Sequence, residues 1–495
     1  MPSVTAVYVD AMTDTRERGA VAPLPTTDTA TGTTPGTAPG TAPGGGALAA
    51  STALLTDRYE LTMLQAALAD GTAHRRCVFE VFTRRLPHGR RYGVLAGTGR
   101  VLEALDTFRF GTAELDWLAD ERVVDDATLE FLAGYRFTGS AVGYAEGEMF
   151  FPQSPVLVVE GTFAEAVLLE TLILSVLNYD SAIASAASRM TSAAVDRPCL
   201  EMGARRAHEQ AAVAAARAAV VAGFAGTSNL EAGRRYGLPT IGTAAHAYTL
   251  LHDDEPSAFA SQVASQGPGT TLLVDTYDVR RGVENALAAA GTGLGAVRLD
   301  SGDLGVLAHE VRAQLDAAGA RDTQIVVTSD LDEHAIASLA VAPVDSYGVG
   351  TALVTGSGAP TCGMVYKLVA REDRDGALQP VAKAARSKTS LGGRKSAARR
   401  LDAGGRAVEE VLVTGPEDAV VAWAQAQDRE PSPDLRPLHV PLVVDGEVTP
   451  GTTGVAGVQA AARRHRASRE ELPRGARRLS ADEAAVPTVE LRVGG

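Results

Sequence analysis

Cysteine is scarce in this sequence, and its scarcity excludes two kinds of stabilising framework. The chain has 495 residues and three widely separated cysteines, Cys77, Cys199 and Cys362. An odd number without metal-ligand spacing indicates neither a disulfide framework nor a cysteine-ligated metal cluster. Long apolar runs are also missing, since no segment approaches the roughly 20 apolar residues that span a bilayer. Residues 1–20 mix acidic and basic side chains and lack the apolar core of a signal peptide. We therefore expect a cytoplasmic protein that contacts no membrane.

Lysine is almost absent as well. The only four are Lys367, Lys383, Lys388 and Lys395. The expected strands before residue 367 therefore offer no Schiff base, which excludes lysine-dependent aldolases. The sequence also lacks the motif Gly-x-x-x-x-Gly-Lys-[Ser/Thr], so any use of ATP is not of the P-loop kind. The net charge of −14 leaves no general basic surface for nucleic-acid phosphates, and we expect no nucleic-acid partner.

Composition divides the chain into four segments. Residues 22–46 are rich in Thr, Pro, Gly and Ala and cannot bury enough apolar surface to order themselves, so we expect a disordered tail over 1–48. An N-terminal α+β domain is expected over 49–155, where Thr56 and Asp57 can cap a helix that begins at Arg58. Strands and helices then alternate over 156–369. We expect 370–495 to pack on the N-terminal domain.

The alternating segment predicts a parallel sheet. Strands are expected at 156–160, 239–243, 271–275, 295–300, 324–329 and 344–349, with helical patterns between them, including 165–177 and 206–221. A doubly wound open sheet is the competing architecture. The single uninterrupted series favours an irregular TIM-like (β/α) barrel, with a second α+β domain built from N- and C-terminal segments. Because a barrel places all strand carboxyl ends on one face, the polar clusters at those ends are expected to share one pocket.

Three of these clusters suggest binding of an anion or a cationic transition state. Gly348-Val-Gly-Thr351 follows a late strand, where barrels often bind phosphate; a plain tight turn is the simpler interpretation. Arg298 and Asp300 lie on the same side of their strand, so they either serve a ligand or form a structural ion pair. Asp275 and Asp278 could approach Mg²⁺ or stabilise a sugar cation, although a helix N-cap is the simpler role for Asp278.

A histidine also ends one of the expected strands. His246 follows Gly242 and Thr243. From spacing alone it is equally a general base, a phosphate acceptor or a structural hydrogen-bonding group.

Taken together, the motifs resemble those of nicotinate phosphoribosyltransferases. The resemblance extends from about Leu54 to Lys395. Its motifs are LLTDRYELTM at 54–63, FEVFTRRLP at 79–87, EMGARR at 201–206, GTAAH at 242–246, RLDSGD at 298–303, GVGT at 348–351 and GMVYKL at 363–368. Two departures concern loop detail: Met202 replaces the usual aromatic residue, and Ser390-Leu391-Gly392 replaces a typical proline-glycine.

The resemblance implies a reaction in which nicotinate and phosphoribosyl pyrophosphate give nicotinate mononucleotide and pyrophosphate, coupled to ATP hydrolysis and dependent on Mg²⁺. It implies that ATP phosphorylates His246, and that Asp275 and Asp300 hold the metal or stabilise the ribose cation. Tyr59 is expected to stack on the pyridine ring, and Arg205 and Arg298 to grip carboxylate or phosphate. The complete set expected at the substrates is Tyr59, Arg205, Ser228, Thr243, Arg298, Gly350, Thr351 and Thr355. The resemblance also implies a homodimer whose N-terminal domains complete each other's sites.

Ser228 is expected to select acid over amide. Related nicotinamide-specific enzymes carry an aspartate at the matching position, which accepts a hydrogen bond from the amide and would repel nicotinate. The nearest rival function is therefore nicotinamide phosphoribosyltransferase. Two more distant rivals are a phosphate-binding barrel lyase or isomerase and a non-catalytic ligand sensor.

Overall fold

The computed structural model describes residues 51–383, 391–430 and 432–494. The tail expected over 1–48 lies outside these residues. The described part of the chain from residue 51 on belongs to one compact unit, so the expected domain boundaries within it remain predictions. No helix in the described part is both long and apolar enough to cross a lipid bilayer.

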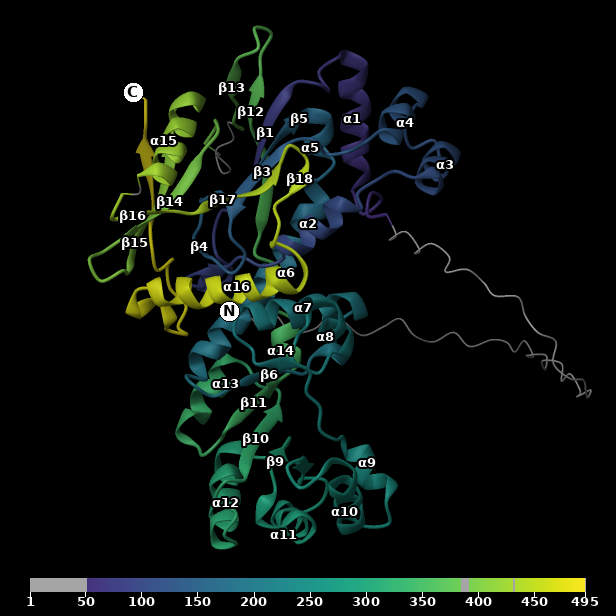
Figure 1. The fold of residues 1–495 in the computed structure, drawn as a ribbon, viewed down its shortest axis with the longest axis vertical. Coiled ribbons are helices and arrows are strands. Elements are labelled where there is room, and N and C mark those ends of the chain that lie inside the picture. Colours follow the sequence, from purple (N-terminus) through teal and green to yellow (C-terminus); the bar gives the residue numbers. More distant parts are fainter. Residues whose placement is uncertain (1–50, 384–390, 431, 495) are drawn as a thin grey trace, which may run out of the picture. The chain divides into compact units, whose positions relative to one another are not determined.

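The largest sheet has seven strands and is antiparallel throughout (Figure 1). In spatial order its strands are β13 (Leu378–Pro380), β12 (Met364–Glu372), β1 (Arg76–Thr83), β5 (Leu157–Thr162), β3 (Ser140–Tyr144), β17 (His439–Val444) and β18 (Glu447–Val448). It therefore joins segments from both ends of the chain. The strand expected at 156–160 is present as β5, but it pairs antiparallel with β1 and β3 and does not belong to the parallel series. An apolar run alone does not reveal which strands will be its partners.

Two smaller sheets accompany the seven-stranded sheet. One contains β16 (Leu435–Pro437), β14 (Ser396–Leu401), β15 (Ala407–Thr414) and β19 (Thr488–Arg492), and the other pairs β2 (Gly93–Val94) with β4 (Met149–Phe150). A buried ion pair connects them, because Arg399 on β14 is fully buried and pairs with Glu148, next to β4, and with Glu410 on β15. Such a buried group is tolerated only when its donors and acceptors are satisfied.

The parallel sheet has six strands. Their spatial order is β7 (Gly226–Thr227), β6 (Cys199–Glu201), β11 (Ser346–Val349), β10 (Gln324–Ser329), β9 (Ala296–Leu299) and β8 (Thr271–Leu273). The strand expected at 239–243 is reduced to a single parallel bridge between Thr227 and Thr240. In the described residues no ladder joins this segment to β8, so the sheet is an open, parallel part-barrel and not a closed ring. The expected mixed α/β fold is confirmed at this coarser level.

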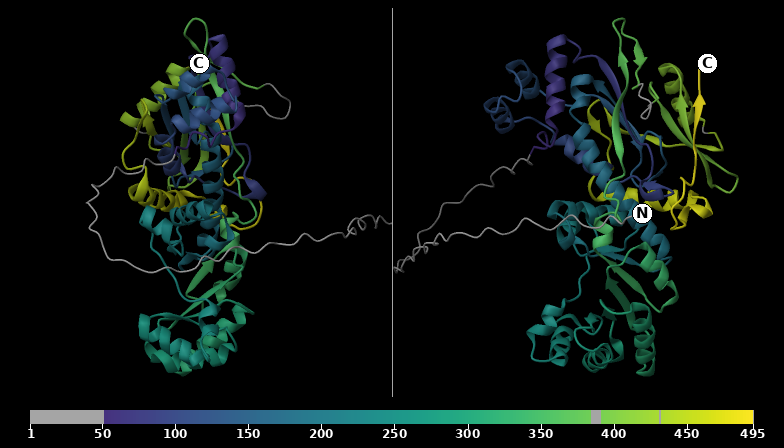
Figure 2. Two further views of the ribbon diagram at one scale, coloured as in Figure 1. Left: turned by 90° about the vertical axis from the view of Figure 1, so that its right-hand side faces the viewer. Right: turned by 180° about the vertical axis from the view of Figure 1, so that it is seen from behind.

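Helices cover the sheets and join them. They are α1 (Arg58–Asp70), α2 (Thr98–Asp106), α3 (Thr112–Asp120), α4 (Asp126–Ala133), α5 (Phe163–Val167), α6 (Glu170–Ala193), α7 (Glu209–Val221), α8 (Leu230–Tyr236), α9 (His246–Leu251), α10 (Glu255–Gln266), α11 (Val279–Ala290), α12 (Leu304–Ala317), α13 (Glu333–Ser338), α14 (Thr351–Val354), α15 (Glu417–Arg429) and α16 (Gly454–Glu471). Short 3₁₀ turns occupy Pro87–Gly89, Ala204–Arg206, Gly291–Gly293, Leu339–Val341 and Arg474–Arg477. Helix α6 contacts both β12 and the short helices α13 and α14, so it links the antiparallel sheet to the parallel part (Figures 1 and 2).

The helices expected from the sequence differ in detail from those observed. The segment 165–177 is divided between α5 and α6. Asp57 takes the N-cap position of α1 as expected, but its side chain makes no capping bond, and the Thr56 hydroxyl donates instead to Glu60. Asp278 does cap α11 through the backbone N–H of Arg281, so the simpler of its two expected roles is confirmed.

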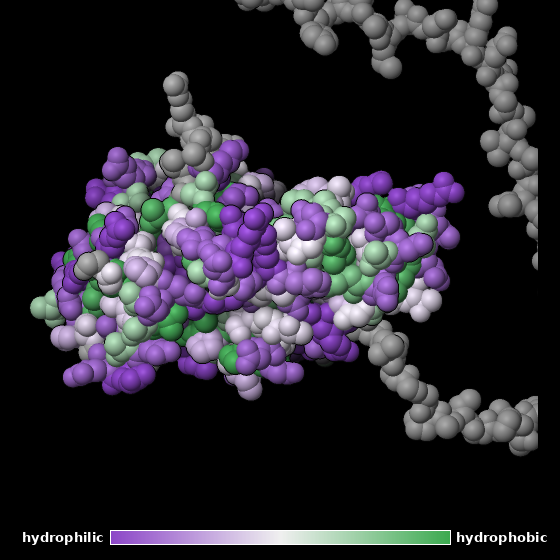
Figure 3. Space-filling model, turned by 90° about the horizontal axis from the view of Figure 1, so that it is seen from above, coloured by the Kyte–Doolittle hydropathy of each residue, from purple (hydrophilic) through white to green (hydrophobic). Residues whose placement is uncertain are grey.

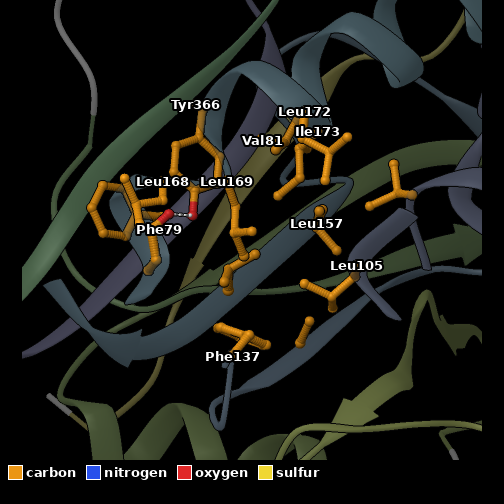
Figure 4. Packing of buried hydrophobic residues seen from close by; sticks show 14 of the residues in the cluster. Phe79, Val81, Leu105, Phe137, Leu157, Leu168, Leu169, Leu172, Ile173 and Tyr366 are labelled. Carbon is orange, nitrogen blue, oxygen red and sulfur yellow. Dashed lines mark hydrogen bonds between the residues drawn. The ribbon is translucent and has the colours of Figure 1, made fainter. Parts of the chain in front are cut away.

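Apolar side chains fill the space between α6 and the seven-stranded sheet (Figure 4). Phe79 of β1 stacks on Tyr366 of β12 with ring centroids 4.8 Å apart. Leu157, Leu172 and Ile173 line an enclosed apolar cavity of about 30 Å³. Because this small cavity is lined almost entirely by apolar side chains, it has no evident ligand. Outside the core, hydrophilic and hydrophobic residues are interspersed on the face seen in Figure 3.

Candidate active site

The carboxyl ends of the parallel strands surround two adjoining cavities. The first has a volume of about 330 Å³ and the second a volume of about 220 Å³. Both are lined by Met202, Arg205, Arg298 and Asp300, so they form one continuous depression. Further expected site residues lie in one cavity or the other: Ser228, Thr243 and His246 in the first, Gly350 and Thr351 in the second. The convergence expected from the sequence is therefore present.

Arg298 lies at the centre of the hydrogen-bonded network in this depression. Its Nε donates to the Thr328 hydroxyl at 2.9 Å, and its Nη1 donates to the Thr243 hydroxyl at 3.0 Å and to the Ala244 carbonyl at 3.2 Å. Its Nη2 donates to Asp300 Oδ1 at 2.9 Å. Because all three nitrogens are engaged, the guanidinium is held in one orientation between β10 and the segment that precedes α9.

Two carboxylates are fixed beside Arg298. The Thr328 hydroxyl donates to Asp300 Oδ1. Asp275 Oδ2 accepts from the Asp300 backbone N–H at 2.9 Å and from the Ser301 hydroxyl at 2.7 Å, whereas its buried Oδ1 has no hydrogen-bond partner among the described residues. Burial opposes ionisation of Asp300, but the hydrogen bonds from Thr328 and Arg298 outweigh it and lower the pKa of that carboxyl. Asp300 is therefore held as a carboxylate.

His246 is the first residue of α9 and lies against both carboxylates. Its Nδ1 is 3.1 Å from the Thr276 hydroxyl. Its Nε2 is 4.0 Å from Asp275 Oδ1 and 4.0 Å from Asp300 Oδ2. The side chain is 39% exposed, so the imidazole is accessible to a ligand in the first cavity. This placement suits proton transfer or acceptance of a phosphoryl group better than a purely structural role.

Glycines allow the close packing of strand ends around the second cavity. A Cβ at Gly348 would clash with Thr328 Cγ2 and would lie 2.8 Å from the Met202 sulfur. A Cβ at Gly203 would clash with Val354. Gly350 is less constrained, because the nearest atom to a Cβ there is 3.5 Å away. Only glycine fits the first two positions without movement of a neighbour.

One strand end carries a strained residue. Ser329, the last residue of β10, has a φ of +146° and lines the second cavity. Side-chain-bearing residues adopt such a conformation rarely and at a cost of about 1–3 kcal/mol. Strain of this kind is concentrated at functional sites, which agrees with the position of Ser329.

Besides Asp275, which lines neither cavity but is hydrogen-bonded to the Asp300 backbone, two expected site residues lie elsewhere. Thr355 does not line either cavity, and its hydroxyl donates back to the Thr351 carbonyl at 2.8 Å. Tyr59 is 45% exposed on α1, outside both cavities of its own chain. Partial burial and the nearby Glu170 carboxylate raise the pKa of Tyr59 to about 12. Neither residue contributes to this depression within one chain.

The structure also brings to the site residues that the sequence did not single out. Thr328 bridges Arg298 and Asp300, and Thr276 contacts His246. Glu201 is fully buried and accepts from the Gly203 N–H and the Thr227 hydroxyl, which ties the ends of β6 and β7 together. Burial raises the pKa of the Glu201 carboxyl. Only their positions at strand ends could have identified these residues as part of the site, since the residue types alone are common in turns.

The arrangement defines a class of protein before any relative is considered. A fixed guanidinium, two carboxylates and an accessible imidazole lie at the carboxyl ends of parallel strands, beside a glycine-containing turn. This is an enzyme-like α/β site for a small anionic ligand.

Comparison with known proteins gives the family. The family model for the N-terminal domain of nicotinate phosphoribosyltransferase matches residues 54–178. A nicotinate phosphoribosyltransferase of Mycobacterium tuberculosis is 56% identical over 443 residues, which cover 88% of this chain and 94% of the relative. One from Bacillus subtilis is 41% identical over 332 residues, covering 65% of this chain and 68% of the relative. The chain belongs to the nicotinate phosphoribosyltransferase family.

A solved structure agrees with this assignment. The crystal structure of human nicotinic acid phosphoribosyltransferase matches with a TM-score of 0.73 and 26% identity, covering 88% of this chain and 97% of the human chain. The similarity thus extends over most of this chain and nearly all of the human chain.

Proposed function

We propose that this protein is a nicotinate phosphoribosyltransferase, which forms nicotinate mononucleotide and pyrophosphate from nicotinate and phosphoribosyl pyrophosphate for NAD biosynthesis. The observation that carries the proposal is the continuous depression in which Arg298, Asp300 and His246 meet the Gly350-Thr351 turn. The 56% identity to the mycobacterial enzyme supports the choice of substrates.

The site residues fit the chemistry of glycosyl transfer. Departure of pyrophosphate leaves positive charge on the ribose, which the Asp300 carboxylate is placed to stabilise. Arg298 supplies a guanidinium whose orientation is fixed by its hydrogen bonds to Thr328, Thr243 and Asp300. Arg205 supplies a second guanidinium that lines both cavities. We assign the 5′-phosphate to the second cavity, where Gly350, Thr351 and Arg205 lie.

Mg²⁺ fits two neighbouring carboxylates: that of Asp300, which lines the first cavity, and that of the buried Asp275, whose Oδ1 lies 4.0 Å from the same His246 imidazole. The buried Asp275 Oδ1 has no hydrogen-bond partner in the described part of the chain, and Asp300 Oδ2 faces the same imidazole. The described residues contain no group of three or more His, Cys, Asp and Glu side chains suited to a metal. Mg²⁺ nevertheless needs only one or two carboxylates when substrate phosphates and water complete its shell. When bound, the ion would neutralise charge on the departing pyrophosphate.

We further propose that ATP phosphorylates His246. Its imidazole is exposed to the first cavity and lies 4.0 Å from both carboxylates. A phosphoryl group there would place negative charge beside the pyrophosphate site, which would couple ATP hydrolysis to organisation of that site.

A homodimer would account for the position of Tyr59. Tyr59 is exposed together with Met63 on the same helix. A second group of exposed apolar side chains follows the ends of the parallel strands, namely Leu230, Leu250, Leu251, Tyr277 and Val306. Exposed apolar surface often marks an interface where it is contiguous. We propose that α1 of a second copy covers this group and brings its Tyr59 to the pyridine ring.

The finer architecture is also a proposal. The spatial series runs from Thr240 through β7, β6, β11, β10 and β9 to β8. His246 and Thr276 follow its two ends in the chain and lie 3.1 Å apart. We therefore regard the sheet as an irregular barrel whose remaining gap lies between the 240 segment and β8.

The proposed function is tested with purified protein, nicotinate, phosphoribosyl pyrophosphate, Mg²⁺ and labelled ATP. We expect nicotinate mononucleotide as the product and an acid-labile label on the protein that is lost in His246→Ala. Turnover that does not depend on phosphoribosyl pyrophosphate would instead favour a lyase or isomerase. Acid-stable label, or full ATP coupling in His246→Ala, would exclude the phosphohistidine.

A further inference from the structure

A buried arginine lies behind the turn that we assign to phosphate. Arg90 is only 5% exposed, and its Nη2 donates to the carbonyl of Gly356, just beyond the end of α14. Among the described residues, its Nη1 is buried without a hydrogen-bond partner, and its guanidinium forms no ion pair. An arginine buried in this way is costly unless its charge or its hydrogen bond serves the structure around it.

The turn that Arg90 contacts is conformationally unusual. Gly356, Ser357 and Gly358 have φ values of +62°, +49° and +79°, so three successive residues are left-handed. The Ser357 N–H donates to the Ala352 carbonyl at 2.6 Å. Only Ser357 among the three has a side chain, and a side chain in this conformation needs support from its surroundings.

Glu333 supplies that support. Its Oε2 accepts from the Ser357 hydroxyl at 2.7 Å, and its Oε1 accepts from Arg189 Nε at 2.9 Å. Arg189 is itself fixed, because its Nη2 donates to the Leu479 carbonyl at 3.0 Å. The end of α14 is thus held by Arg90 through Gly356 and by Glu333 through Ser357.

The same group carries net positive charge. Two guanidinium groups, those of Arg90 and Arg189, accompany the single carboxylate of Glu333, and all three side chains are buried. Charges in a poorly solvated interior act over longer distances than charges in water. The excess positive charge lies at the C-terminal end of α14, a helix of four residues. The N-terminal end of this helix, at Thr351, lines the second cavity.

We infer that Arg90, Glu333 and Ser357 form a clamp that positions Gly350 and Thr351 for the phosphate of the substrate, with Arg90 as its principal positioning residue. This inference rests on the proposed function, because it takes the second cavity as the phosphate site. The clamp does not touch substrate. It fixes the far end of α14, so that the residues at the cavity need little rearrangement when phosphate binds.

The clamp predicts a specific kinetic pattern. The enzyme holds the phosphate equally in the ground state and in the transition state. Loss of the clamp therefore changes KM and leaves kcat nearly constant. We expect Arg90→Gln to raise KM for phosphoribosyl pyrophosphate about tenfold while kcat and KM for nicotinate stay within about twofold. A general loss of structure would instead change all three parameters together.

Two further variants separate charge from position. Arg90→Lys keeps the charge but loses the planar fork, so we expect an intermediate KM. Ser357→Gly keeps a permitted left-handed backbone and removes only the hydroxyl that contacts Glu333. If Arg90→Gln does not fold, this variant tests whether the clamp positions Gly350 and Thr351. Arg91→Gln is the matched control, because the neighbouring Arg91 pairs with the exposed Asp482 and lies outside the clamp.

Binding of inorganic phosphate to the full-length protein, measured by calorimetry, makes the test independent of turnover. We expect Arg90→Gln and Ser357→Gly to weaken phosphate binding several-fold and Arg91→Gln to leave it unchanged. If the wild-type protein binds phosphate but forms no nucleotide, the proposed function fails while the clamp is still tested. Equal phosphate affinity in wild type, Arg90→Gln and Ser357→Gly would overturn the clamp. So would a rise in KM for nicotinate as large as the rise in KM for phosphoribosyl pyrophosphate.

Discussion

At the scale of single residues, Thr328 is one of the groups that lower the pKa of Asp300. Its hydroxyl accepts from Arg298 Nε and donates to Asp300 Oδ1, and these bonds hold the carboxyl pKa below its ordinary value. In Thr328→Val both bonds are lost, so the pKa of Asp300 should rise. We expect kcat/KM to fall about 10–100-fold and the acidic limb of its pH profile to move to higher pH.

Thr328→Ser is the control for this prediction. Serine retains the hydroxyl that links Arg298 to Asp300, so steady-state rates across the pH range should stay near those of the wild type. A Thr328→Val enzyme with an unshifted acidic limb would show that Asp300 is not the group that titrates there.

Substrate selection is also a single-residue question. Ser228 lines the first cavity, and its backbone N–H donates to the Glu201 carbonyl at 2.8 Å, so its position is fixed by the end of β6. A carboxylate at this position would repel nicotinate and accept a hydrogen bond from nicotinamide. Ser228→Asp should therefore lower the ratio of kcat/KM for acid over amide by about tenfold or more. Competition assays with both substrates measure the ratio, and Ser228→Asn provides an uncharged control.

At the scale of elements, the end of β10 stores strain that a glycine would relieve. Ser329 has a φ of +146°, which costs about 1–3 kcal/mol, whereas glycine costs about 0.5–1 kcal/mol in lost chain entropy. The difference predicts that Ser329→Gly lies between neutral and about 2.5 kcal/mol more stable. Thermal and urea unfolding measure this change. Ser338→Gly, at the end of α13, should be destabilising by up to about 1 kcal/mol, as expected for a helical position.

The ends of the strands were easier to predict from the sequence than their partners. Runs such as 324–329 and 344–349 became β10 and β11 because a buried parallel strand is apolar throughout and its polar end is conspicuous. β5 was assigned to the wrong sheet, since its apolar run is equally compatible with an antiparallel neighbour. The segment 239–243 forms only one bridge, and hydrophobicity alone does not specify that a ladder will be interrupted.

Site residues were also predictable only where their residue type is unusual at a strand end. Arg298, Asp300 and His246 were predictable because charged side chains at apolar strand ends are unusual. Thr276 and Thr328 were not, because a threonine at a strand end has many ordinary roles. Tyr59 lies outside the cavities of its own chain, and the hydrophobic pattern does not specify which expected site residues meet within one chain.

At the scale of the whole molecule, buried histidines make stability depend on pH. Burial lowers the pKa of His439 to about 4 and that of His465 to about 3. Their ordinary pKa is near 6.5, so between these values the unfolded chain binds protons that the folded chain does not. Stability is therefore fully present above about pH 6.5 and is lost as the pH falls toward about 4.

The slope of this loss gives a quantitative test. Each histidine contributes about 1.4 kcal/mol per pH unit to the fall in unfolding free energy. Urea unfolding at several pH values should show the slope expected for two protons below about pH 6, beyond what exposed groups contribute. His439→Gln can still donate to the Pro155 carbonyl and should reduce the slope by one proton. An unchanged slope in that variant would contradict the assignment.

The most direct test of nucleotide formation at this site compares wild-type protein with Asp300→Asn, using nicotinate, phosphoribosyl pyrophosphate and Mg²⁺, with and without ATP. We expect nicotinate mononucleotide from the wild type, formed faster with ATP, and a loss of at least about 100-fold in Asp300→Asn with its fold intact. Absence of product from well-folded wild-type protein, or equal rates for the two proteins, would contradict the assignment of this site.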